Sequence, residues 1–170
     1  MKRNCIAQSS RAIGLAAIMA LFFVFGFAQS QAQYTPLTGP GSAYSVPQAQ
    51  LIQPDALNRL LQAKGTGKPL LLQVGSRLLF DEGHIAGSVY VGAAAQADGL
   101  QQLQNMAAKL PKTKFIVLYC GCCPWNHCPN VGPAYNQLHS MGFTNVKVLY
   151  LPNNLGDDWA AKGYALERGH

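Results

Sequence analysis

Hydrophobic positions along the chain form short continuous runs that alternate with longer amphipathic segments. The short apolar runs have the length and composition of buried strands and cover residues 69–74, 89–91, 115–119 and 146–150. The amphipathic segments carry apolar side chains at helical spacing and cover residues 54–64, 100–110, 133–141 and 157–161. Because strands alternate with helices, the pattern predicts an α/β domain with a parallel β-sheet covered by helices on both faces.

The first 32 residues have a different pattern. A basic start (Lys2, Arg3 and Arg11) precedes the apolar run 12–28, and small residues follow up to Ala32. This order is typical of a secretory signal peptide. An uncleaved membrane anchor is the alternative, although 17 apolar residues are at the short limit for a spanning helix. We therefore expect residues 1–32 to be a signal peptide that directs export to the periplasm or the extracellular space.

Residues 33–45 are rich in Gln, Thr, Pro, Gly and Ser without periodicity, which indicates a flexible tether before a globular domain at residues 46–167. The formal net charge of +6 comes partly from the leader. Without the three basic residues of the leader, ten basic side chains remain against seven acidic ones, and they form no cluster. This distribution argues against a nucleic-acid partner.

The cysteines outside the leader are gathered at one point. Cys120, Cys122, Cys123 and Cys128 lie within nine residues, directly after the apolar run 115–119. Disulfides that hold a small exported fold together are spread along the chain, so this cluster indicates a local site. Ligands bind at the carboxyl ends of parallel strands, which is where Cys120 stands. Since backbone N–H groups of the next turn would stabilise a thiolate there, we expect Cys120 to have the most stabilised thiolate.

Several segments resemble the rhodanese domain family in order and spacing. They are LLLQVG at 70–75, FDEGHIAGS at 80–88, FIVLYC at 115–120, the stretch 138–149, and the DW and KGY elements within 158–164. The resemblance implies a sulfurtransferase in which Cys120 holds a sulfane sulfur as a persulfide. A sulfur donor and a thiol acceptor, each a small molecule or a protein, would be its partners, and no cofactor is expected. His84 and Gly87 belong to the motif, where a structural role is implied.

The chain departs from the family pattern at the end of its second strand. Gln73 and Gly75 stand where the family usually has an acidic residue and an arginine, and Arg77 is a candidate substitute for that arginine. Phosphatases that share the fold need an arginine where this chain has Asn126, so phosphoryl transfer is excluded.

The loop after Cys120 also departs from the family. Residues 120–130 form a longer loop than the family's usual one and contain no Lys or Arg. A small anion such as thiosulfate would therefore find only N–H groups and His127. We take Gly121, Trp125 and His127, together with Arg77, as candidate substrate-binding residues.

The additional cysteines admit three interpretations. In the first, Cys123 or Cys128, with Cys122 as a further candidate, resolves a persulfide or disulfide on Cys120, as the C-x-x-C spacing of Cys120 and Cys123 suggests. In the second, the set binds a soft metal such as Zn or Cu(I), with His127 as a possible extra ligand, in a non-catalytic metal- or partner-binding module. The adjacency of Cys122 and Cys123 argues against this, since both cannot readily face one ion. In the third, Cys122 or Cys123 pairs with Cys128 and staples the loop.

Overall fold

The computed structural model describes residues 45–169. The predicted signal peptide and all but the last residue of the predicted tether lie outside these residues. The elements are η2 (Gln48–Gln50), β1 (Leu51–Ile52), α1 (Pro54–Gln62), β2 (Leu70–Gln73), α2 (Arg77–Glu82), β3 (His84–Ile85), β4 (Val89–Tyr90), α3 (Ala97–Ala107), β5 (Ile116–Tyr119), η3 (Trp125–His127), α4 (Val131–Ser140), β6 (Val146–Leu149), α5 (Leu155–Asp158), η4 (Ala160–Lys162) and β7 (Leu166–Glu167). Within this part of the chain, no helix has the length and hydrophobicity needed to cross a membrane.

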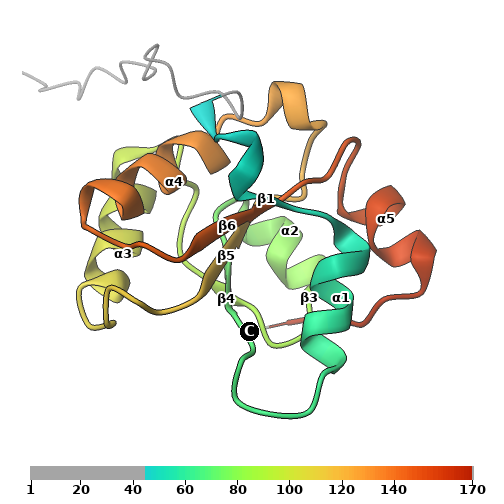
Figure 1. The fold of residues 1–170 in the computed structure, drawn as a ribbon. Helices are drawn as coiled ribbons and strands as arrows, with labels where there is room; N and C mark the ends of the chain where they lie inside the picture. The colour runs from blue at the N-terminus through green and yellow to red at the C-terminus, as the bar shows by residue number, and fades with distance from the viewer. Residues whose placement is uncertain (1–44, 170) are drawn as a thin grey trace, which may run out of the picture. The chain divides into compact units, whose positions relative to one another are not determined.

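The central sheet has five parallel strands in the order β1-β6-β5-β2-β4. Its middle strand, β5, is buried along its whole length, as the continuous apolar run predicted. Helices α3 and α4 lie on one side of the sheet, and α1, α2 and α5 lie on the other (Figure 1). The predicted parallel α/β fold with helices on both faces is therefore confirmed.

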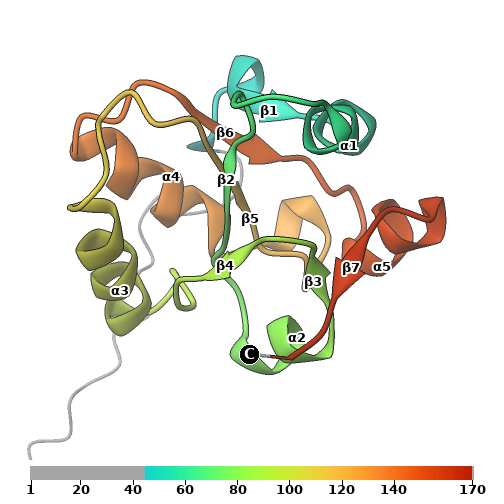
Figure 2. The ribbon, with the colours of Figure 1, turned by 90° about the horizontal axis from the view of Figure 1, so that it is seen from below.

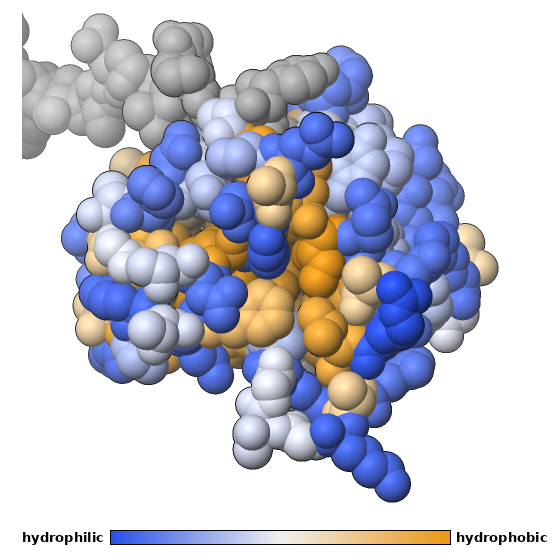
Figure 3. Space-filling model, in the orientation of Figure 1, coloured by the Kyte–Doolittle hydropathy of each residue, from blue (hydrophilic) through white to orange (hydrophobic). Residues whose placement is uncertain are grey.

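Two hydrophobic cores fill the two sides of the sheet. Ile116 and Leu118 of β5 point into the core shared with α3 and α4, whereas Val117 and Tyr119 point into the core shared with α1 and Trp159. This alternation follows from the two-residue period of a strand. On the face shown in Figure 3, hydrophobic residues form a band through the middle and hydrophilic residues cover both flanks.

Strands β3 and β7 form a separate antiparallel pair, in which Ile85 is opposite Leu166. They lie side by side next to α2 in the view from below (Figure 2). The hydroxyl of Tyr119 ties this pair to the central sheet, because it accepts a hydrogen bond from the Ile85 N–H at 3.1 Å and lies 2.7 Å from the Ser88 hydroxyl. Burial raises the pKa of Tyr119 to about 12, so the hydroxyl keeps its proton.

The predicted helices and the observed ones differ at their ends. Helix α1 begins as predicted and ends two residues before the end of the predicted 54–64. Helix α3 begins and ends three residues before the predicted 100–110, and α4 begins two residues and ends one residue before the predicted 133–141. The predicted helix at 157–161 is divided between α5 and the 3-10 turn η4. These shifts arise because terminal turns carry polar and small residues that periodicity alone does not locate.

Replacement of Gly99 by alanine is expected to destabilise the domain by about 3 kcal/mol. A Cβ atom at this position in α3 would lie 2.1 Å from the carbonyl oxygen of Ala93, which belongs to the loop after β4, and backbone atoms cannot yield easily. Denaturant unfolding measures the effect. Gly67→Ala is the matched control, since a Cβ there meets nothing within 4 Å, and it should change stability by less than about 0.5 kcal/mol. Equal stability of the two variants would contradict this packing.

Candidate active site

Cys120 follows directly after the last residue of β5, at the carboxyl edge of the central sheet. Its side chain is buried, with 5% of its surface exposed. Gln73 ends the neighbouring strand β2 and holds the backbone here: its Nε2 donates to the Cys120 carbonyl at 3.1 Å, and its Oε1 accepts from the Gly75 N–H at 3.2 Å. The residue that replaces the family's acidic side chain therefore positions the Cys120 backbone.

Three sulfur atoms form a chain at this point. The Sγ atoms of Cys120 and Cys122 are 3.1 Å apart, and those of Cys122 and Cys123 are 3.3 Å apart. All three lie within 4.8 Å of one another, and we call them the thiol cluster. Gly121 makes this possible, because its positive φ of 83° turns the chain back between Cys120 and Cys122.

All four cysteines of the loop are free thiols in this structure, so no disulfide staples the loop. The thiol nearest to Cys120 is that of Cys122, whereas the C-x-x-C spacing pointed to Cys123. Cys123 instead directs its thiol to the His127 carbonyl at 3.7 Å as well as toward Cys122. Cys128 is buried, with 4% of its surface exposed.

Asn130 contacts the Cys120 sulfur, and the sequence analysis did not identify it as a site residue. Its Nδ2 donates to Cys120 Sγ at 3.3 Å, and its Oδ1 accepts from the Ala95 N–H at 2.8 Å. An asparagine directly before a helix is a typical N-cap, so its position in the sequence gave no indication that it contacts the sulfur. Here it makes no side-chain cap hydrogen bond to α4, so its amide is directed to the sulfur.

The pKa shifts within the loop differ from the expectation that Cys120 has the most stabilised thiolate. Interactions with the sulfurs of Cys122, Cys123 and Cys128, of which Cys122 has the largest effect, together with burial, raise the pKa of Cys120. The same interaction with Cys120 lowers the pKa of Cys122 to about 6. Between these two contacting thiols, the pKa shifts therefore favour the negative charge on Cys122 over Cys120.

The start of helix α4 stabilises Cys128 and not Cys120. Interaction with the Cys120 thiol is the main cause that lowers the pKa of Cys128 to about 7, and the backbone N–H groups of Asn130 and Val131 lower it further. The long loop explains the difference. It places Cys128 three residues before the start of α4, near the N–H groups of Asn130 and Val131, and leaves Cys120 at the end of β5.

A cavity of about 380 Å³ opens beside the thiol cluster. Its walls combine leucines, glycines, two amide side chains, one acidic residue and two of the cysteines. The lining residues are Leu79, Leu155, Leu166, Gly83, Gly121, Gly156, Gln73, Asn154, Glu82, Cys120 and Cys122. No Lys or Arg belongs to this lining. The cavity can therefore receive a small organic molecule next to the two closest sulfurs, but it offers an anion no cationic side chain.

The structure brings Gly121 to the cavity and places the other three predicted binding residues elsewhere. Trp125 packs edge-on against Tyr150 at 5.2 Å. His127 is exposed, and only its carbonyl contacts the thiol cluster. Arg77 pairs with Asp81 at 3.0 Å and lies over the ring of Tyr90, so it does not substitute for the family's arginine at the cavity.

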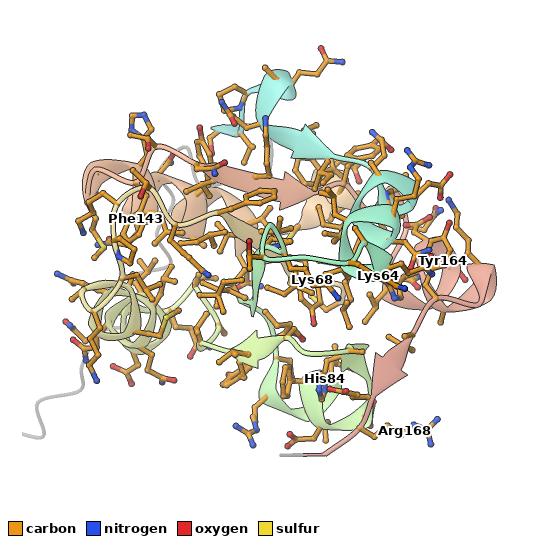
Figure 4. All side chains as sticks on the ribbon, turned by 60° about the horizontal axis from the view of Figure 1, so that its bottom comes forward. Lys64, Lys68, His84, Phe143, Tyr164 and Arg168 are labelled. Atoms are coloured by element: carbon orange, nitrogen blue, oxygen red, sulfur yellow. The ribbon has the colours of Figure 1, made fainter. Side chains whose placement is uncertain are left out.

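His84 and Gly87 lie in the layer that supports the cavity wall. His84 is buried, its Nδ1 is 2.7 Å from the Phe80 carbonyl, and its ring stacks on Phe80 at 3.8 Å. Figure 4 shows it beside α2 and β7. The Gly87 N–H donates to the carboxylate of Glu167 in β7 at 2.9 Å. Both residues hold β7 in place, and β7 supplies the cavity residue Leu166.

Comparison with known proteins returned one family model and several solved structures. The model of the Rhodanese-like domain matches residues 54–150. The rhodanese-like domain of the Alr3790 protein from Anabaena sp. is 23% identical with a TM-score of 0.52, and the match covers 70% of this chain and 79% of that one. The BH2092 protein from Bacillus halodurans is 19% identical with a TM-score of 0.54, and the match covers 69% and 75%.

A third solved structure, thiosulfate sulfurtransferase from Pseudomonas aeruginosa, is 22% identical with a TM-score of 0.51. The match covers 72% of this chain but only 20% of that larger one. A search of curated proteins found no match. At these identities the solved structures establish a shared fold, and the match of the family model extends from the start of α1 to the residue after β6.

Proposed function

The chain belongs to the rhodanese-like domain family, and from this premise we propose that it is a sulfurtransferase that carries a sulfane sulfur on Cys120 and passes it to a thiol acceptor. The observation that carries the proposal is the pair of sulfurs 3.1 Å apart, Cys120 and Cys122, at the wall of a cavity. The signal peptide predicted at residues 1–32 would place this reaction outside the cytoplasm.

Activation of Cys120 requires the loss of its proton. At neutral pH Cys122 is the deprotonated partner, because its pKa is about 6, and its sulfur is the nearest acceptor for the Cys120 proton. Transfer of the proton leaves a thiolate on Cys120 and a thiol on Cys122. The amide of Asn130, which donates to Cys120 Sγ, then stabilises the new negative charge.

The reaction has two transfers of sulfur. The Cys120 thiolate attacks the outer sulfur of a donor persulfide, the S–S bond of the donor breaks, and the donor leaves as a thiolate. Cys120 then holds the sulfur as a persulfide. An acceptor thiolate attacks the outer sulfur of this persulfide, takes it as a new persulfide, and returns Cys120 to the thiolate.

A second exit for the sulfur uses Cys122. If the Cys122 thiolate attacks the inner sulfur of the persulfide, a Cys120–Cys122 disulfide forms and the outer sulfur leaves as hydrosulfide. An external dithiol must then reduce the disulfide before another turnover. The 3.1 Å contact supports Cys122, more than Cys123 or Cys128, as the resolving thiol.

Mass spectrometry tests the proposal directly. Brief incubation of the reduced chain with an organic persulfide donor, in the absence of an acceptor, should add one sulfur to the peptide that contains Cys120. Addition of a thiol acceptor should remove that sulfur and produce the persulfide of the acceptor. Sulfur found only on other residues would contradict the proposed function. So would the absence of both a persulfide on Cys120 and a Cys120–Cys122 disulfide formed with release of hydrosulfide.

Thiosulfate is expected to be a poor donor. The lining of the cavity has no Lys or Arg and includes the acidic residue Glu82, so a dianion loses charge-assisted hydrogen bonds there. One such bond contributes about 1.5–3 kcal/mol, which corresponds to a kcat/KM about ten- to a hundredfold lower for thiosulfate than for an uncharged alkyl persulfide. Steady-state assays with both donors measure the ratio.

The same argument predicts the effect of adding a cation. Glu82→Lys should raise kcat/KM for thiosulfate by about tenfold and leave the value for the alkyl persulfide nearly unchanged. Asp98→Lys makes the same change of charge on an exposed residue of α3, outside the cavity lining, and serves as the control. Thiosulfate as the better donor of the unsubstituted chain, or an equal response in both variants, would contradict the assignment of this cavity to the donor.

A further inference from the structure

The thiol cluster also has the composition of a metal site. Its three Sγ atoms lie within 4.8 Å of one another, and two of the pairs are 3.1 and 3.3 Å apart. The sequence argued against such a site, because neighbouring cysteines rarely face one ion. In the structure the sulfurs of Cys122 and Cys123 nevertheless lie 3.3 Å apart, and the turn at Gly121 brings the sulfur of Cys120 close to both.

The distances fit a metal ion at the centre of a triangle. Sulfur ligands about 2.3 Å from such an ion stand about 4 Å from one another. The observed separations are shorter for two pairs and at most 4.8 Å for the third. Small side-chain rotations of Cys122, which is exposed, and Cys123, which is partly exposed, are enough to reach that triangle while the buried Cys120 stays in place.

The donor set selects the kind of metal. It consists of three thiolate sulfurs with no nitrogen or oxygen ligand, and neither His127 nor Cys128 belongs to the three-residue group found among the described residues. Structural zinc sites need four ligands in a tetrahedron. Cu(I) is soft, prefers thiolates and accepts three of them in a plane. The number and chemistry of the ligands therefore favour Cu(I).

The surroundings suit a cation held by thiolates. No Lys or Arg lines the adjoining cavity, and the one charged residue of its lining is the acidic Glu82, so no cationic side chain of the lining repels an entering cation. Cys122 lines this cavity and gives the entering ion a first ligand. At the buried end, Nδ2 of Asn130 donates to Cys120 Sγ, the kind of outer contact that orients a metal ligand and stabilises its charge.

We propose that Cys120, Cys122 and Cys123 bind one Cu(I) ion. Each thiol releases its proton when its sulfur binds, and no electron is transferred. This binding goes beyond the proposed function but uses the same sulfur atoms, so a bound Cu(I) ion would prevent Cys120 from accepting sulfane sulfur. The same loop would then hold either a sulfur atom or a copper ion.

A competition titration tests the proposal. The full chain with Cys5→Ser, which leaves only the thiols of the loop, is reduced and titrated without oxygen with the Cu(I) complex of bicinchoninate. One equivalent of Cu(I) should move from the chelator to the protein, and X-ray absorption should show three sulfur ligands. Cys122→Ser and Cys123→Ser should each weaken Cu(I) binding by at least about tenfold, whereas Cys128→Ser should leave it unchanged.

Several outcomes would overturn the proposal. One is transfer of less than half an equivalent of Cu(I), and another is equal binding by a Cys122→Ser, Cys123→Ser double variant. A loss in Cys128→Ser as large as in Cys122→Ser would overturn the three-sulfur set, and displacement of Cu(I) by equimolar Zn(II) would overturn the choice of metal. Thermal melting of each variant checks that the fold is kept. The titration contains no sulfur donor, and sulfur transfer is assayed with excess chelator, so either proposal can fail alone.

Discussion

Cys120→Ser is expected to reduce sulfur transfer by at least about a thousandfold. Serine keeps the size of the side chain and can accept the hydrogen bond from Asn130, but an alcohol at neutral pH is neither an adequate nucleophile for sulfane sulfur nor able to hold it. No other thiol of the loop combines burial at the end of β5 with a place in the cavity wall. The measurement is persulfide-to-thiol transfer under saturating donor.

The fold of this variant should be kept, because no cysteine of the loop ties two elements of the sheet together through a disulfide. A change in the free energy of unfolding of about 1 kcal/mol is expected for a buried thiol replaced by a hydroxyl that still has a hydrogen-bond partner. Cys123→Ser is the control, because it also removes one thiol from the loop, and it should retain measurable sulfur transfer. Full activity of Cys120→Ser would overturn the sulfurtransferase proposal.

Cys122→Ser is expected to suppress the release of hydrosulfide by at least about tenfold and to let the persulfide on Cys120 accumulate. Cys122 is the nearest thiol to Cys120, and its pKa of about 6 makes it the thiolate that can attack the inner sulfur at neutral pH. One exposure to an alkyl persulfide without acceptor, followed by detection of hydrosulfide and of the modified peptide, measures both effects.

Cys123→Ser and Cys128→Ser are the comparison variants for the loss of hydrosulfide release. The C-x-x-C spacing predicts that Cys123 resolves the persulfide, whereas the distances predict that its removal has the smaller effect because its sulfur contacts Cys122 and the His127 carbonyl. A larger loss of hydrosulfide release in Cys123→Ser than in Cys122→Ser would show that Cys123 is the resolving thiol, as the C-x-x-C spacing predicts. Unchanged release in all three variants would remove the internal disulfide from the reaction.

Much of the fold could be predicted because its strands are buried on both faces. The run at 115–119 has no charged position and the run at 146–150 has only Lys147, which is typical of central parallel strands, and they became β5 and β6. Strands β3 and β7 have two residues each and were not predicted, since such lengths show no period. They pair with each other across 80 residues of sequence, and the Tyr119 hydroxyl contacts Ile85 from the central sheet, so both contacts are tertiary.

The position of Cys120 could be predicted because a strand places the residue after it at a known edge of the sheet. The arrangement of the remaining cysteines could not, because it depends on one glycine with positive φ and on a hydrogen bond from the Leu155 N–H to the Gly121 carbonyl at 3.0 Å. The C-x-x-C spacing therefore suggested Cys123 as the resolving partner of Cys120, whereas the fold of the loop places the Cys122 sulfur nearest to Cys120. The contact of Asn130 with sulfur has no sequence signal beyond its place before α4.

Gly75 limits how the site can be redesigned. It stands where the family usually has an arginine, and a Cβ atom there would lie 2.9 Å from Cys120 Sγ, 3.0 Å from Gln73 Nε2 and 3.2 Å from the Cys120 carbonyl oxygen. Any larger residue at this position would press against the sulfur, so an arginine introduced here would displace the group that it is meant to serve. Engineering of this domain toward anionic donors therefore has to place its cation on another wall of the cavity.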